Sequence, residues 1–100
     1  MRAFSPSITD GAITITEVTS TPEEEELTFK DRHMLISNVG ANSCAIALTS
    51  TDELPESPCL IPVLANSQIL IKREPEHKYL FAFAGAETTT TLIITPGRGF

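Results

Sequence analysis

Two histidines are the first candidates for chemistry in this chain of 100 residues. A hydrolase needs a nucleophile, a base and an acid that orients the base. His33 stands at the start of an apolar segment, and His77 lies in a charged turn beside Lys78. The chain holds no Gly-x-Ser-x-Gly elbow, dinucleotide-binding loop or phosphate-binding loop. We therefore expect both histidines to be structural or solvated, and we predict no enzyme, no catalytic residue and no cofactor.

Cys44 and Cys59 are the only cysteines. They would make a zinc site only together with both His33 and His77, and their spacing matches no zinc-finger pattern. A disulfide-dense secreted scaffold would also contain more cysteines. We predict no metal site and expect two small buried side chains, with a Cys44–Cys59 bridge as the alternative.

The densest charge is the acidic run 23–26, which is four glutamates. Calcium loops alternate their ligands with spacers and usually include a glycine, and this run does neither. We interpret it as a solvated loop or a rim of ion pairs. Because proline suits the first helical position and acids suit the first turn, Pro22 could also begin a short helix here.

Three aromatic residues alternate along one segment: Tyr79, Phe81 and Phe83. Alternation with period 2 would place them on one face of a strand. Aromatic faces can stack on sugar rings, so a carbohydrate-binding module is one candidate function. A small sandwich, however, needs its large side chains for its own core, where each contributes ~1.5–3 kcal/mol. We therefore expect these aromatics to lie in the core.

The elements that position these residues are predicted to be strands. Ile and Thr are abundant and fit a pleated sheet, whereas seven Pro and five Gly interrupt the chain. About seven or eight short strands with regular turn signals predict an all-β fold, an antiparallel β-sandwich or jelly roll. The expected strands are 12–16, 27–29, 33–39, 44–48, 68–72, 78–84 and 88–95, and we expect 33–39 and 44–48 to form a hairpin. Because Pro62 lacks an N–H, 60–64 is expected to be an edge strand or an extended connection. The predicted organisation is an N-terminal arm (1–11), a sandwich domain (12–95) and a C-terminal tail (96–100).

The charge balance argues against several classes of partner. Seven Lys and Arg face thirteen Asp and Glu, which gives a net charge of −6. Nucleic acids and anionic lipids attract basic surfaces, so we expect neither as a partner. No apolar run approaches the ~20 residues of a spanning helix. The first residues lack the apolar core of a secretory signal, and we expect synthesis in a cytosol.

The chain ends are the remaining candidates for a site. Arg2 and Phe4 lie near one end, and Arg98 and Phe100 lie near the other. Arginine and aromatic residues are enriched at protein interfaces. We predict that these four residues bind a partner, with frayed ends as the alternative.

Several turn motifs carry a resemblance to a known family. They are ISNVG at 36–40, the return CAIAL at 44–48, LIPVLANS at 60–67 and TLIITPGRG at 91–99. Residues 34–99 resemble a family of small tailed-bacteriophage virion proteins, whose members carry similar I-P-x-x-A-G-S and V-T-P-G-x-G segments. Asn66 stands where that family commonly has glycine, and asparagine tolerates the same turn. The first 33 residues match poorly.

This resemblance implies a capsid decoration, or cement, protein. Such a protein binds the capsid exterior and bridges neighbouring major capsid subunits, commonly as a homotrimer or a dimer. We therefore expect the major capsid protein and copies of this chain as partners, and the virion as the location. A tail or head–tail connector component is the alternative within the same particle.

Overall fold

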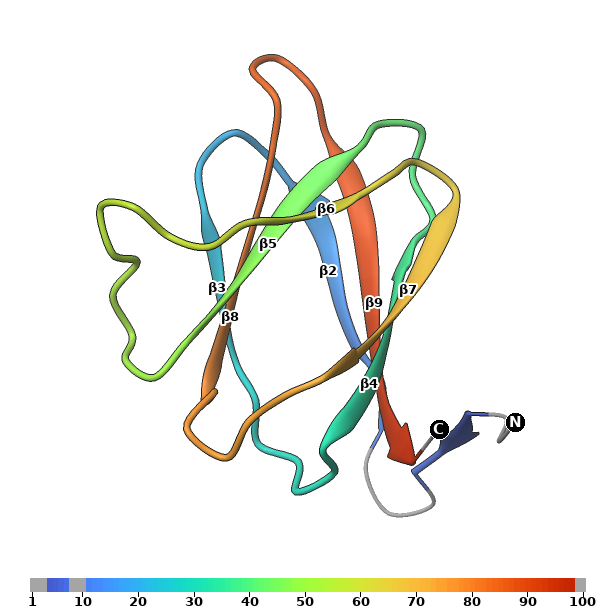
Figure 1. The fold of residues 1–100 in the computed structure, drawn as a ribbon. Coiled ribbons are helices and arrows are strands. Elements are labelled where there is room, and N and C mark those ends of the chain that lie inside the picture. The colour runs from blue at the N-terminus through green and yellow to red at the C-terminus, as the bar shows by residue number, and fades with distance from the viewer. Residues whose placement is uncertain (1–3, 8–10, 99–100) are drawn as a thin grey trace.

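The computed structural model describes residues 4–7 and 11–98 of the chain. Within these residues every pair of neighbouring strands is antiparallel. The strands form two sheets that face each other, so the predicted all-β sandwich is confirmed (Figure 1). The described residues include no helix that has the length and apolar character needed to cross a membrane.

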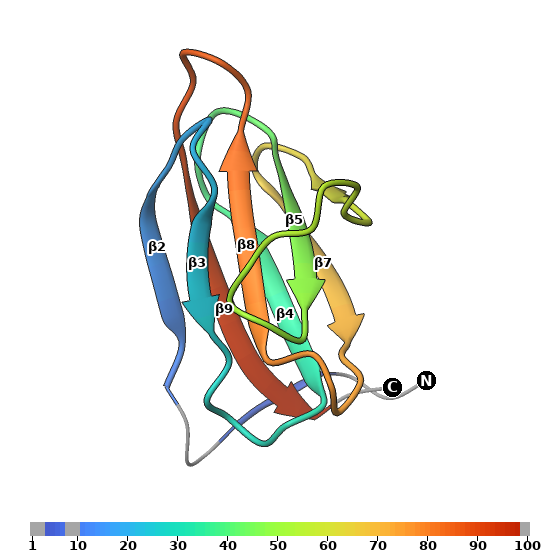
Figure 2. The same ribbon diagram turned by 90° about the vertical axis from the view of Figure 1, so that its left-hand side faces the viewer.

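The two sheets have a jelly-roll order. In sheet A, β9 lies beside β4. β1 and β2 pair with the other side of β9, and β7 pairs with the other side of β4. Sheet B has the order β3-β8-β5-β6. Figure 2 shows sheet B in front of sheet A. Most connections cross from one sheet to the other, as in a jelly roll. The strands are β1 (Ser5–Pro6), β2 (Ile13–Val18), β3 (Glu23–Glu26), β4 (His33–Asn38), β5 (Cys44–Thr49), β6 (Ile61–Val63), β7 (Ser67–Lys72), β8 (Tyr79–Ala84) and β9 (Thr90–Arg98).

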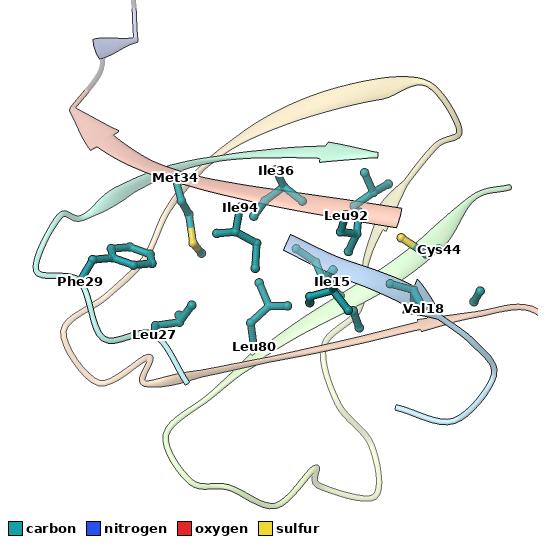
Figure 3. Close-up of a cluster of buried hydrophobic side chains, with 14 residues drawn as sticks. Ile15, Val18, Leu27, Phe29, Met34, Ile36, Cys44, Leu80, Leu92 and Ile94 are labelled. Carbon is teal, nitrogen blue, oxygen red and sulfur yellow. The ribbon is translucent and has the colours of Figure 1, made fainter. Parts of the chain in front are cut away.

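The core lies between the sheets. Alternate side chains of each strand point inward, and Figure 3 shows Ile94 of β9 and Leu80 of β8 pointing toward one another. Both side chains are fully buried. The cluster comprises Ile15, Val18, Leu27, Phe29, Met34, Ile36, Cys44, Ile46, Val63, Leu80, Ala82, Ala84, Leu92 and Ile94.

The predicted hairpin of 33–39 with 44–48 is wrong. β4 pairs with β7 and β9 in sheet A, whereas β5 pairs with β6 and β8 in sheet B. Asn38 explains the crossing, because its buried amide nitrogen donates to the carbonyl of Asn42 at 2.9 Å and to that of Val63 at 3.1 Å. The turn after β4 is therefore held against sheet B.

The acidic run is a strand, not a loop or the start of a helix. β3 pairs with β8 in a regular register, from Glu23 opposite Ala82 to Glu26 opposite Tyr79. An edge position explains this, because an edge strand leaves charged side chains in water. The predicted strand 27–29 is also wrong, since these residues form an irregular segment. Leu27 and Phe29 are nevertheless buried and fill the end of the core.

The last strand was expected to end at Thr95 but runs to Arg98. Pro96 lies inside it, opposite Met34 of β4. The Val39 amide donates to the Thr91 carbonyl at 3.0 Å, so alternation turns the backbone of Pro96 away from β4. The missing N–H of proline therefore costs no bond with β4. On the other side the Pro96 carbonyl accepts from the Ser7 amide at 2.8 Å.

Candidate interaction surfaces

The first and last described strands pair at one end of the sandwich. β1 pairs with the tip of β9, with Ser5 opposite Arg98 and Pro6 opposite Gly97. Figure 1 shows β1 beside that tip. Phe4 directly precedes β1 and is half-buried, and Arg98 is exposed. We call Phe4 and Arg98 the chain-end surface.

The chain-end surface contains two of the four residues that were predicted to bind a partner. The other two, Arg2 and Phe100, lie outside the described residues. The β1–β9 pairing brings the segments that carry Phe4 and Arg98 together. Aromatic and arginine side chains are suited to bind a protein surface, because such groups contribute strongly when buried at an interface.

The aromatic stripe of β8 lies outside the cluster between the sheets, so the core assignment is wrong for the half-buried Tyr79 and Phe83, whereas Phe81 is buried as expected. Leu80, Ala82 and Ala84 fill the core side, which leaves the alternate residues on the outer side of sheet B. The opposing positions on β5 are small, with Ala47 facing Phe81 and Ala45 facing Phe83. We call Tyr79, Phe81 and Phe83 the aromatic face.

Part of the aromatic face is covered. Figure 2 shows the segment between β5 and β6 passing in front of sheet B. Phe81 is only 6% exposed, whereas Tyr79 and Phe83 are half-buried. Burial raises the pKa of Tyr79, and the nearby carboxylates of Glu26, Asp52 and Glu24 raise it further. The phenol therefore stays protonated at neutral pH and can donate a hydrogen bond.

His77 lines an open hollow of ≈ 530 Å³ together with the segment after β5. Its Nδ1 accepts a hydrogen bond from the Glu74 amide at 3.0 Å, which closes the turn between β7 and β8. The hydroxyls of Thr49 and Thr51 donate to carbonyls of the same loop. Within the described residues, the His77 imidazole makes no hydrogen bond with a hydroxyl or a carboxyl group. The hollow thus holds polar groups that stabilise its own loops.

His33 lies elsewhere. It stands at the first position of β4, between Lys72 of β7 and Gly97 of β9. This position is on the outer side of sheet A, because the next residue, Met34, is fully buried. His33 is not among the residues that line the hollow beside His77.

Arg73 is half-buried and makes contacts that the sequence did not reveal. Its guanidinium donates to the carbonyls of Phe29, Asp31 and His77 and stacks over the Phe29 ring, 4.6 Å from the centroid. Desolvation lowers the pKa of Arg73, and the charge of Asp31 opposes that shift. The side chain ties the segment before β4 to the turn after β7. Only the three-dimensional fold places these carbonyls together, so no sequence motif marks them.

Both cysteines are free thiols. Cys44 is buried, as expected, and burial raises its pKa to about 11. Cys59 is exposed, so the expectation of a second buried thiol is wrong. In the part of the chain that the structure describes, no group of three or more His, Cys, Asp or Glu side chains could hold a metal ion.

Comparison of the chain with protein-family models, curated proteins and solved structures found no match. Jelly rolls serve many purposes, including viral capsid and lectin domains. A fold alone does not assign a function. The function is therefore argued from the chain-end surface and the aromatic face.

Proposed function

We propose that this chain is a non-enzymatic structural protein of a phage virion, made in the host cytoplasm, that binds the capsid exterior and bridges neighbouring major capsid subunits. One observation carries the proposal. The β1–β9 pairing brings the segments that carry Phe4 and Arg98 together at one end of the sandwich. The turn motifs that resemble small phage virion proteins agree with this role.

The physical effect of such a protein is stabilisation by mass action. A ligand that binds only the assembled shell shifts the equilibrium toward assembly. Each contact can be weak, because many copies act together and an oligomer, a homotrimer or a dimer, gains further from multivalency. An acidic chain of net charge −6 suits an exterior position, where contact with DNA is not needed.

Capsid occupancy tests this proposal. Deleting residues 1–7 removes β1, and Arg98→Ala removes the exposed cation at the tip of β9. Both changes should lower the number of copies bound per capsid at least tenfold while the sandwich stays folded. Lys78→Ala is the control, since Lys78 is also an exposed cation but directly precedes β8 of sheet B. Full occupancy by both variants would refute the role of the chain ends.

A second candidate is a carbohydrate-binding module, which the outward aromatic face favours. Tyr79 and Phe83 are both half-buried on the outer side of sheet B. Half-exposed rings can stack on a sugar, and the carboxylates near Tyr79 can accept hydrogen bonds from sugar hydroxyls. A glycan array probed with the wild-type chain and with Phe83→Ala tests this function. Binding that the variant loses supports it, and an array without signal removes it.

A further inference from the structure

The edge strands of the two sheets differ in how well they can prevent a strand of another chain from pairing with them. An edge strand presents unpaired N–H and C=O groups, which form a template for a strand of a second chain. In the described residues, β2 and β7 lie at opposite edges of sheet A, and β3 and β6 lie at opposite edges of sheet B. Three of these edges carry a feature that opposes strand addition.

Each protected edge uses a different feature. β3 consists of glutamates, which repel a second acidic strand. β6 is three residues long and contains the exposed Pro62, which has no N–H to donate. The register between β2 and β9 shifts between Ile15 and Val18, and such a bulge bends an edge away from a regular ladder.

β7 carries none of these features. It is six residues long, contains neither proline nor an acidic residue, and keeps an unbroken register with β4. The Arg73 amide donates to the Arg32 carbonyl at 2.7 Å, so the residue just after β7 faces β4. Alternation then turns the backbone groups of Gln68, Leu70 and Lys72 outward, to the open side.

Three exposed apolar residues lie next to β4 and β6 in the chain. The exposed large hydrophobic residues of the described chain are Val39 (53%), Leu60 (45%) and Leu64 (65%). Leu60 and Leu64 flank β6, which leads directly into β7, and Val39 follows the residue of β4 that pairs with Ser67. Leu64, the most exposed of the three, lies between the end of β6 and the start of β7.

We propose that two copies of this chain pair through β7, antiparallel about a twofold axis at Leu70. In this register Leu70 faces Leu70 of the second copy, and Gln68 faces Lys72 of the second copy. All three outward residues then exchange backbone hydrogen bonds, and sheet A continues across both molecules. The two Lys72 side chains start about 13 Å apart, four residues of strand, which exceeds the screening length of ~8 Å at physiological salt.

A second copy fits this edge because the strand is complementary to itself. The antiparallel pairing opposes no like charges within β7. The glutamates of β3 lie on the opposite side of the sandwich from β7, as both Figures 1 and 2 show, so the strongest negative charge stays away from the contact. A C2 dimer uses the same surface on both subunits, which this edge supplies. The inference does not depend on capsid binding.

The mass of the purified chain in solution tests the pairing. Sedimentation velocity should give a dimer, twice the 10.8 kDa of one chain. Leu70→Pro removes an outward N–H without removing a bond to β4, and it should weaken the dimer at least tenfold. A wild-type chain that stays monomeric would overturn the proposal and indicate that a strand of another protein pairs with β7.

Glu24→Pro is the matched control for the proline substitution. The Leu27 amide donates to the Lys78 carbonyl at 2.8 Å, so alternation turns the Glu24 amide toward solvent at the β3 edge. This variant should remain a dimer. An equal loss of dimer from Glu24→Pro and Leu70→Pro would contradict pairing through β7.

Cysteine cross-linking tests the register and does not require the proline variant to fold. In a Cys59→Ser background, which removes the exposed native thiol, Leu70→Cys should form a disulfide-linked dimer under mild oxidation. Facing residues in an antiparallel pair have Cα atoms about 5.5 Å apart, within the range of a disulfide. Gln68→Cys in the same background should not cross-link, because its equivalent lies about 13 Å away. Equal cross-linking of both variants would contradict the axis at Leu70.

Discussion

Asn38 is the residue that most directly joins the two sheets. It is 1% exposed, and its amide oxygen accepts from the Thr90 hydroxyl at 2.6 Å and from the Gly40 amide at 3.0 Å. Its amide nitrogen donates to carbonyls of the following turn and of β6. A buried polar group is favourable only when its partners are all satisfied, and here each one is.

Asn38→Leu should lower the free energy of unfolding by about 3 kcal/mol, because buried partners left without a hydrogen bond cost roughly 1–3 kcal/mol each. Urea denaturation measures the change. Asn42→Ala is the control, since the Asn42 side chain makes one exposed bond, to the Thr89 carbonyl, and should cost less than about 1 kcal/mol. Equal losses would show that the Asn38 bonds do not stabilise the fold.

The two thiols should behave differently in the folded protein. Cys59 is exposed and should react with a disulfide reagent at once, whereas Cys44 should react only after unfolding. A thiol titration should therefore count one rapidly reacting thiol per chain without urea and two in urea. Two fast thiols in the native protein would contradict the burial of Cys44.

The same thiol predicts a pH dependence. Burial raises the pKa of Cys44 from 9.0 to about 11, so folding favours the protonated form. The stability that folding gains from the protonated Cys44 thiol is complete below pH 9 and is lost as the pH rises from about 9 to about 11. Urea denaturation across this range should show a fall in stability that Cys44→Ala lacks. Parallel curves for the two proteins would contradict it.

At the scale of elements, the turn after β4 requires glycine at position 40. A Cβ there would lie 1.9 Å from the Thr90 Oγ1 and 2.9 Å from the Thr90 Cα. Gly40→Ala should therefore cost about 1–3 kcal/mol, because the turn or β9 has to move. Gly11→Ala, with nothing within 4 Å of the added Cβ, should change stability by less than ~0.5 kcal/mol in the same urea titration. A neutral Gly40→Ala would contradict this close approach.

The strands show where sequence patterns suffice. β9 follows its alternation closely from Thr90 to Pro96, because one face packs on the core, and β2 does so from Ile13 to Thr16, before its bulge. In β8, alternation alone does not identify the core face, because both faces are apolar. The larger aromatic side chains suggested that their face packs between the sheets, but the face of Leu80 does. The core accepts Leu80, Ala82 and Ala84 because side chains of sheet A fill the space opposite them.

Two elements depended on tertiary pairing. β3 is a strand of glutamates only because β8 offers it a partner and the edge keeps its side chains in water. β9 continues through Pro96 only because that residue needs no bond to β4. Intrinsic propensity argues against a strand at both places, and the neighbouring strand overrides it.

At the scale of the molecule, the sequence predicted the all-β class but not the connections. The pairing of β9 with β4 and β2 joins segments that are far apart in the chain, and no local signal encodes it. The same limit applies to the candidate site. Composition pointed to Phe4 and Arg98, but only the β1–β9 pairing brings their segments together.

Labelling of intact virions tests the central claim most directly. The proposal predicts that an antibody against this chain, applied to purified virions and viewed by electron microscopy, marks many positions spread over the capsid exterior. A signal confined to one vertex would contradict capsid decoration and indicate a tail or connector component. Particles without any label would contradict a structural role in the virion.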